Sequence, residues 1–154
     1  MKERHEQFLT KAFRRPVDRE VLGRYLGFAE LQLENGVEFT EVMKSLAAAA
    51  IASPKFLYLY DESSDPGGVE DLNDYELASR LSFFLWGSIP DEDLLELAAA
   101  GELTQAKVLD GQVERMLKDR KLKRFCDSFP SQWLQLDRII SAIPDPKKYT
   151  DYYF

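Results

Sequence analysis

The sequence has little of the chemistry from which most catalytic and metal sites are built. Its 154 residues include a single cysteine, Cys126, and a single histidine, His5. One cysteine cannot close a disulfide within the chain, and a structural zinc site draws about four ligands from Cys and His. The Cys-x-x-Cys-His pattern that attaches haem is also absent. The composition therefore excludes these sites and predicts that this chain binds no cofactor.

The signatures of common enzyme classes are missing as well. The sequence contains no Gly-x-Gly-x-x-Gly motif, no Gly-rich loop that ends in Lys-Ser or Lys-Thr, and no Gly-x-Ser-x-Gly elbow. Dinucleotide-binding, nucleotide-binding and serine hydrolase functions therefore have no support. No catalytic constellation is recognisable, so the sequence does not establish whether the protein is an enzyme.

Long apolar segments are absent. No stretch approaches the roughly 20 apolar residues that cross a bilayer, and the longest uncharged runs are residues 45–54 and 81–90. Residues 1–6 lead into no apolar segment of the kind found in signal peptides. We predict no membrane insertion, and we expect any export signal to lie upstream of residue 1.

Basic residues are fewer than acidic residues. Lys and Arg total 20 against 27 Asp and Glu, which gives a formal net charge of −7. Binding to nucleic acid draws on cations gathered on one face, so we predict no nucleic-acid partner. The basic run at residues 118–124 is interpreted as the solvated side of a helix. DNA binding is the alternative, which fluorescence anisotropy at low salt would test.

Apolar residues recur at helical spacing in almost every segment of the chain, which predicts helices and no strand. Asp18 and Thr104 are predicted N-caps, Gly36 and Gly87 are predicted helix ends, and Pro130 should kink or restart the last helix. Residues 56–60 are predicted to form a short helical or extended piece. The predicted helices are 3–14, 18–34, 38–52, 73–86, 91–100, 104–117 and 119–136.

A segment of turn-forming residues at 61–68 divides the chain. We predict an all-α fold with orthogonal or bundle-like packing of two small helical units, joined by this Gly/Pro/Ser-rich linker. The predicted boundaries are 1–60 for the first unit, 61–71 for the linker and 72–154 for the second unit. Because the chain closes on three aromatic residues, we expect the second unit to be truncated.

Three arginines are candidate binding residues. Arg80 lies at the border of an apolar helix face, four residues after Glu76, which favours an ion pair between the two. The alternative is an anion-binding arginine in a cleft between the units. Arg14 and Arg15 close the first helix, where cations cap the helix end and form ion pairs between units. Docking of a partner is the alternative for these two.

The two tryptophans, Trp86 and Trp133, both fall on apolar helix stripes, which favours packing in the core. Sugar binding by an exposed ring is the alternative, and Trp86 is kept as the fourth candidate binding residue. The acidic cluster at residues 91–96 is interpreted as helix capping and not as a calcium site. Cys126 is predicted to be buried and inert, and His5 to lie near a mobile terminus, so no Cys-His pair is expected.

Four segments resemble a known pair of domains. Residues 8–16 and 50–57 resemble the opening and the end of one planctomycete-type domain of unknown function. Residues 72–94 and 129–136 resemble parts of the domain that usually follows it. The resemblance to these paired PSD-type domains covers most of residues 5–137, and the segment 72–94 is quite specific.

The resemblance implies a setting but no reaction. Members are typically large exported proteins of Planctomycetes and related bacteria, and many carry a cytochrome-c-like segment upstream, which implies an exported or periplasmic parent protein. Our leading hypothesis is a helical structural or interaction module whose partners are neighbouring domains of that parent. The alternatives are a fragment of a redox or carbohydrate-acting enzyme whose catalytic groups lie elsewhere, and glycan binding through exposed aromatic rings.

Overall fold

The computed structural model describes residues 2–59 and 71–136, together with residues 138, 143, 145, 147, 148 and 150–152. Within these ranges every regular element is helical, which confirms the predicted all-α class. The same part of the chain holds no helix that combines the length and apolar character of a membrane span. The predicted linker at 61–71 lies outside the described residues except for Asp71.

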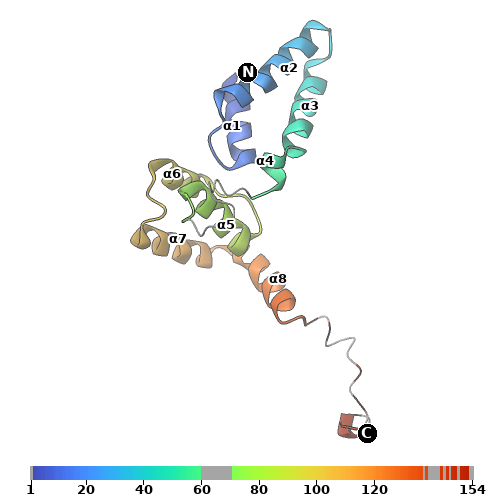
Figure 1. Ribbon diagram of the computed structural model, residues 1–154, viewed down its shortest axis with the longest axis vertical. Helices are drawn as coiled ribbons and strands as arrows, with labels where there is room; N and C mark the ends of the chain where they lie inside the picture. Colours follow the sequence, from blue (N-terminus) through green and yellow to red (C-terminus); the bar gives the residue numbers. More distant parts are fainter. Residues whose placement is uncertain are drawn as a thin grey trace.

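Four helices form the first unit, which we call the α1–α4 unit (Figure 1). Two apolar clusters hold it together, one where α1 meets α2 and α3, and one between α2 and α3. Leu9 and Ala50 belong to the first cluster, and Ala29 and Val42 to the second. The helices are α1 (Lys2–Phe13), α2 (Arg19–Glu34), α3 (Phe39–Ile51) and α4 (Pro54–Leu57).

The helix ends of this unit follow local sequence signals. Asp18 occupies the N-cap position of α2 as predicted, although its side chain accepts no capping hydrogen bond. Gly36 adopts a φ of 79°, the left-handed conformation that glycine tolerates and that reverses the chain before α3. Ser53 accepts a hydrogen bond from the backbone N–H of Lys55, and Pro54 starts α4, where a missing N–H costs nothing.

The second unit, which we call the α5–α8 unit, contains the remaining long helices. Asn73 and Glu76 form a reciprocal capping box at the start of α5, and Gly87 and Gly101 end α5 and α6 in the left-handed conformation. The elements are α5 (Asp74–Trp86), α6 (Glu92–Ala100), α7 (Ala106–Lys118), a 3₁₀ turn (Arg120–Leu122) and α8 (Lys123–Trp133). A second 3₁₀ turn follows at Thr150–Tyr152.

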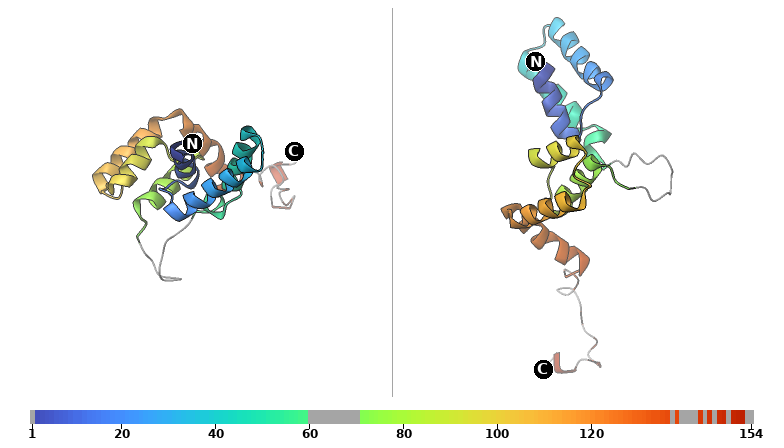
Figure 2. Two further views of the ribbon diagram at one scale, coloured as in Figure 1. Left: turned by 90° about the horizontal axis from the view of Figure 1, so that it is seen from above. Right: turned by 90° about the vertical axis from the view of Figure 1, so that its left-hand side faces the viewer.

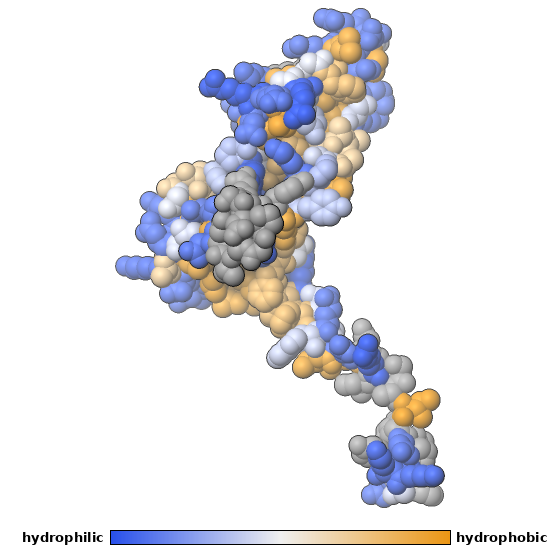
Figure 3. Space-filling model, in the orientation of Figure 1, coloured by the Kyte–Doolittle hydropathy of each residue, from blue (hydrophilic) through white to orange (hydrophobic). Residues whose placement is uncertain are grey.

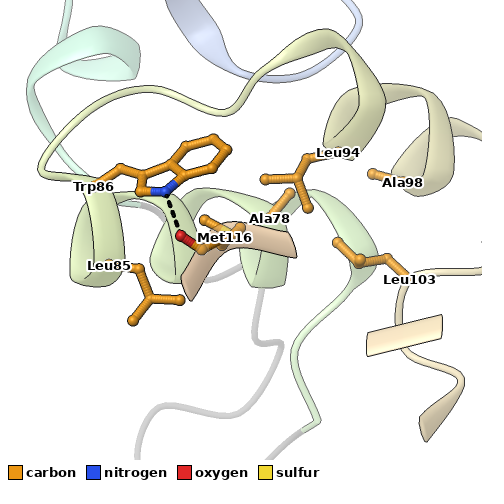
Figure 4. Packing of buried hydrophobic residues seen from close by; sticks show 7 residues of the cluster. All are labelled: Ala78, Leu85, Trp86, Leu94, Ala98, Leu103 and Met116. Atoms are coloured by element: carbon orange, nitrogen blue, oxygen red, sulfur yellow. Dashed lines mark hydrogen bonds between the residues drawn. The ribbon is translucent and has the colours of Figure 1, made fainter. Parts of the chain in front are cut away.

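The core of this unit surrounds Trp86, whose side chain is completely buried (Figure 4). Its indole N–H donates a hydrogen bond of 3.2 Å to the carbonyl of Met116 on α7. Leu94 on α6 and Leu103 in the following turn are also fully buried in this cluster. Packing of apolar side chains from three helices around one indole therefore fixes how α5, α6 and α7 sit together.

The two units meet end to end. Figures 1 and 2 show the C-terminal end of α1 and the short helix α4 next to α5, with α8 leading away from the other side of the second unit. Contacts that cross the junction include an ion pair between Lys11 and Glu92, an ion pair between Arg15 and Glu76, and Arg14 above the ring of Phe83. Charged and aromatic side chains thus join the units.

Some local expectations differ from the structure. The N-cap position of α7 is Gln105 and not Thr104, whose backbone N–H donates a hydrogen bond to the carboxylate of Asp74. Helix α8 continues through Pro130, so it does not restart there, and the alternative of a kink stays a prediction. His5, expected near a mobile terminus, lies within α1 and is 3% exposed, since α1 packs against α3.

Candidate functional site

Arg14 sits at the junction of the two units and is 4% exposed. Its guanidinium donates hydrogen bonds to the carbonyl oxygens of Lys55, Phe56 and Tyr58 at 3.1, 3.0 and 2.9 Å, and a longer one to Ala12. Three of these carbonyls belong to the C-terminal part of α4 and the residue after it, where helix carbonyls lack partners. Arg14 therefore caps α4, a helix far from it in sequence.

The central carbon of the same guanidinium lies 5.5 Å from the centre of the Phe83 ring on α5. One side chain thus connects α1, α4 and α5. Its backbone has a φ of 61°, which is uncommon for a residue other than glycine. Burial, with a smaller contribution from the charge of Arg15, lowers the pKa of Arg14 from its ordinary value, and the group stays cationic.

Arg15 and Glu76 form a second contact between the two units. Their charged atoms are 3.8 Å apart, and Glu76 is only 6% exposed because it also closes the capping box of α5. An ion pair between units, part of the favoured interpretation, is present at Arg15. The expected capping of the first helix differs, because Arg14 bonds mainly to carbonyls of α4 and only through its longest hydrogen bond to Ala12 of α1. The carboxylate of Glu76 lies close to Arg15, and the predicted ion pair of Arg80 with Glu76 stays a prediction.

A cavity of about 420 Å³ opens beside these residues at the junction of the two units. It brings together Arg14, Arg15 and Arg80, three of the four candidate binding residues. Trp86, the fourth, does not line it. The remaining lining residues come from both units: Phe13, Pro16, Asp18, Lys55, Leu59, Asn73, Tyr75, Glu76 and Ser79.

Trp86 lies instead in the core of the α5–α8 unit, as the packing interpretation predicts. Two cations cover its ring: the Nζ of Lys121 is 4.1 Å from the ring centre, and the guanidinium carbon of Arg115 is 5.4 Å away. Arg124 donates a hydrogen bond to the Trp86 carbonyl at 3.1 Å. Lys121 and Arg124 belong to the predicted basic run, so part of that run serves the core and is not simply a solvated face.

Asp91, in the acidic cluster, caps α6 as predicted and also pairs with an arginine. Its carboxylate accepts the backbone N–H of Leu94 as the cap of α6 and forms a two-pronged ion pair with Arg115 at 2.7 and 3.1 Å. Burial would raise the pKa of Asp91, but these hydrogen bonds outweigh it and lower the pKa below its usual value. Among the described residues, no group of three or more His, Cys, Asp or Glu side chains could hold a metal ion.

Four aromatic rings form a continuous stack along α5 and α8, which we call the aromatic face: Phe84, Phe125, Phe129 and Trp133. Phe84 meets two rings edge-on, at 5.0 Å from Phe125 and 5.5 Å from Phe129. Phe125 stacks on Phe129 at 4.8 Å, and Phe129 stacks on Trp133 at 5.8 Å. Figure 3 shows a hydrophobic area where Figure 1 draws these two helices.

This face corrects two sequence interpretations. Trp133 was expected to pack in the core, yet its side chain is 71% exposed, and Phe84 is 54% exposed. Cys126 was expected to be buried and is also exposed. In each case the residue lies on an apolar stripe as predicted, but α8 packs mainly on α5 and nothing described covers its remaining apolar side. The run of aromatic residues at four-residue spacing on α8 was the available signal.

The geometry defines a class of protein: an all-α chain in which two small helical units meet at an arginine-lined junction and one helix presents stacked aromatic rings. The chain belongs to the PSD4 family, described as a protein of unknown function (DUF1592), which matches residues 72–153. Residues 1–61 match a second family, PSD5, also described as a protein of unknown function (DUF1595). The resemblance to paired PSD-type domains is therefore confirmed. The chain matches no curated protein and no solved structure.

Proposed function

We propose that this chain is a non-catalytic helical interaction module of a larger exported multidomain protein, and that the aromatic face packs against a neighbouring domain of that protein. The observation that carries the proposal is the exposure of two rings of the stack, Phe84 at 54% and Trp133 at 71%, while Phe125 and Phe129 are half-buried. Contiguous exposed apolar surface of this kind marks protein–protein contacts. Aromatic rings also supply most of the energy at such contacts.

The position of the face supports a neighbour in the same polypeptide. Trp133 is the last residue of α8, so the chain leaves the long helices at the stack itself. A domain that follows α8 in a longer polypeptide reaches this surface through a short connection, which raises its effective concentration there. The resemblance to multidomain exported proteins favours the same arrangement.

Cys126 provides a direct test, because it is exposed and lies seven residues before Trp133, two helical turns along the same side of α8. The rate at which a maleimide reagent labels Cys126 would be compared between this chain and the longer natural polypeptide, with peptide-level mass spectrometry as the readout. We expect labelling to be at least several-fold slower in the longer polypeptide, since the neighbouring domain covers the face.

A cysteine introduced at Glu30 provides the matched control, because Glu30 is exposed on α2 in the other unit. The Glu30→Cys site should label at the same rate in both polypeptides. Equal labelling of Cys126 in the two contexts would contradict the proposal.

Glycan binding is the second candidate, and the exposure of Trp133 is the observation that favours it. A glycan array probed with the wild-type chain and with Trp133→Ala separates the two functions. We expect no glycan signal. A signal that disappears in Trp133→Ala would replace the docking proposal with a carbohydrate-binding one.

A further inference from the structure

The two units have separate apolar cores. Among the described residues, the clusters that contain Leu9 and Val42 are built from the first unit alone, and the cluster around Trp86 is built from the second unit alone. The helices that lie in extended contact with one another are likewise partners within one unit. The described core packing therefore holds each unit together but does not hold one unit to the other.

Charged side chains make the contacts described across the junction. Lys11 on α1 pairs with Glu92 on α6 at 2.7 Å, and both side chains are largely in water, 57% and 72% exposed. An exposed ion pair stabilises a contact only weakly, and salt screens it further. Because polar interfaces between units of one chain ordinarily permit relative motion, we expect movement at this junction.

Arg14 stays with the first unit when the units move. The hydrogen bonds of its guanidinium go mainly to carbonyl oxygens at the end of α4, whereas its contact with the second unit is the ring of Phe83 at 5.5 Å. A cation is attracted to an aromatic ring when it lies over the face within about 6 Å of the ring centre. The guanidinium can therefore shift over Phe83 without losing a hydrogen bond.

Glu76 has the corresponding place in the second unit. Its carboxylate accepts the backbone N–H of Asn73 at 3.0 Å in the capping box of α5, and it lies 3.8 Å from Arg15 of the first unit. The distance to Arg15 is near the upper limit of about 4 Å for an ion pair. Because the capping hydrogen bond lies within one unit, separation of the units would break the ion pair and leave the start of α5 intact.

The cavity of about 420 Å³ beside these contacts leaves space for the units to turn. Its walls belong to both units, with Lys55 from α4 and Arg80 from α5. The width of the cavity therefore depends on the angle between the units. A close-packed joint would resist such movement, whereas this cavity separates parts of the two units.

We propose that the junction is a hinge between the two units, with the ring of Phe83 as the surface on which Arg14 pivots. The two ion pairs at the junction hold the hinge closed at low ionic strength, and salt shifts the population toward open orientations. The hinge sets how the aromatic face is oriented relative to the first unit. It does not depend on the function proposed for that face.

The test is a set of distance distributions between pairs of spin labels, measured by double electron–electron resonance in a Cys126→Ser background. Glu30→Cys on α2 and Asp110→Cys on α7 form the pair that spans the junction. Two pairs within a unit are the controls, Glu30→Cys with Ser45→Cys in the first unit and Asp110→Cys with Glu96→Cys in the second. All four labelled positions are exposed.

We expect the spanning pair to give a distribution at least about twofold wider than that of either control pair at about 0.01 M salt. Salt at about 1 M reduces the screening length to about 3 Å. It should widen the distribution of the spanning pair further and leave both control distributions unchanged.

Lys11→Gln is the decisive variant, because it removes one partner of the exposed ion pair with Glu92. It should widen the distribution of the spanning pair at about 0.01 M salt and reduce the further effect of salt. Lys44→Gln is the matched control, since it changes the net charge equally and removes the lysine of an exposed pair with Glu41 inside the first unit. It should leave the spanning distribution unchanged.

Three results would each overturn the proposal. They are a spanning distribution as narrow as those of the control pairs, a spanning distribution that does not respond to salt, and equal effects of Lys11→Gln and Lys44→Gln. In the last case net charge, and not the ion pair between the units, would set the distribution.

Discussion

The two tryptophans of the α5–α8 unit differ sharply in how much of each side chain is exposed to solvent. Trp86 at the end of α5 is completely buried and donates a hydrogen bond to Met116, whereas Trp133 at the end of α8 is 71% exposed and contacts another ring only on one side. Both lie on apolar stripes at helical spacing. The difference is that α6 and α7 close over Trp86, while the described part of the chain places no element over Trp133. The spacing of apolar residues shows which face of a helix is apolar. Whether another element of this chain buries that face depends on tertiary packing.

The largest effect should come from Trp86→Ala. Truncation of a fully buried aromatic side chain leaves a cavity and removes its hydrogen bond, so we expect a loss of about 3–5 kcal/mol in the free energy of unfolding. Urea denaturation followed by circular dichroism measures it. A loss below about 1 kcal/mol would show that the core around Trp86 is not packed as described.

Arg14→Ala should follow with a loss of about 2–3 kcal/mol, because several carbonyls lose a charged donor and Phe83 loses its cation. Arg14→Gly sharpens the test. Both variants lack the guanidinium, but glycine adopts a φ of 61° without strain, so Arg14→Gly should be about 1 kcal/mol more stable than Arg14→Ala. The reverse order would contradict the left-handed conformation at this position.

Asp91→Asn should have a smaller effect that depends on pH. Asparagine can still cap α6 through its one side-chain oxygen, but its amide group replaces the second oxygen that accepts from Arg115. The variant therefore removes the charge that faces Arg115 and one of the two hydrogen bonds of this pair. The pKa of Asp91 is lowered in the folded state, so its contribution is present above the ordinary value of 3.8 and is lost as pH falls through the folded pKa. We expect a loss of about 1 kcal/mol at pH 7 that vanishes at the lowest pH at which the fold survives.

Glu41→Gln is the matched control for that prediction, because it removes one carboxylate from an exposed i,i+3 pair with Lys44 on α3. Its effect at pH 7 should be below about 0.5 kcal/mol. An equal effect of the two variants would contradict the special role of the Asp91–Arg115 pair.

Trp133→Ala should have the smallest effect on the isolated chain. The ring is mostly in water already, so its removal should change the free energy of unfolding by less than about 1 kcal/mol. The same denaturation experiment checks it. A loss similar to that of Trp86→Ala would show that Trp133 is buried and would remove the basis for the aromatic face.

Local structure followed from the sequence wherever short-range chemistry decides it. Asn73 with Glu76 and the glycines at 36 and 87 start or end helices through their own side chains or backbone freedom. The N-cap position of α7 is Gln105 and not the predicted Thr104, whose backbone N–H donates a hydrogen bond to Asp74, thirty residues away in the chain. A contact of that kind depends on how α5 and α7 are placed, which periodicity does not contain.

The candidate site could be predicted only in part. Arg14 and Arg15 could be picked out from the sequence because they are two cations at the end of a predicted helix. In the structure both residues make the contacts described at the junction. The capping of α4 by Arg14 depends on the return of the chain to the same place some forty residues later, so no local pattern announces it. The burial of His5 and the exposure of Cys126 likewise depend on which helices pack against α1 and α8.

Acrylamide quenching of tryptophan emission tests the central contrast most directly, because the chain contains only two tryptophans. Wild type would be compared with Trp133→Phe, which leaves Trp86 as the sole emitter. The emission lost in Trp133→Phe should be red-shifted and strongly quenched, and the emission that remains should be blue-shifted and nearly resistant to quenching. Equal protection of the two signals would show that Trp133 is covered within this chain and would contradict the account.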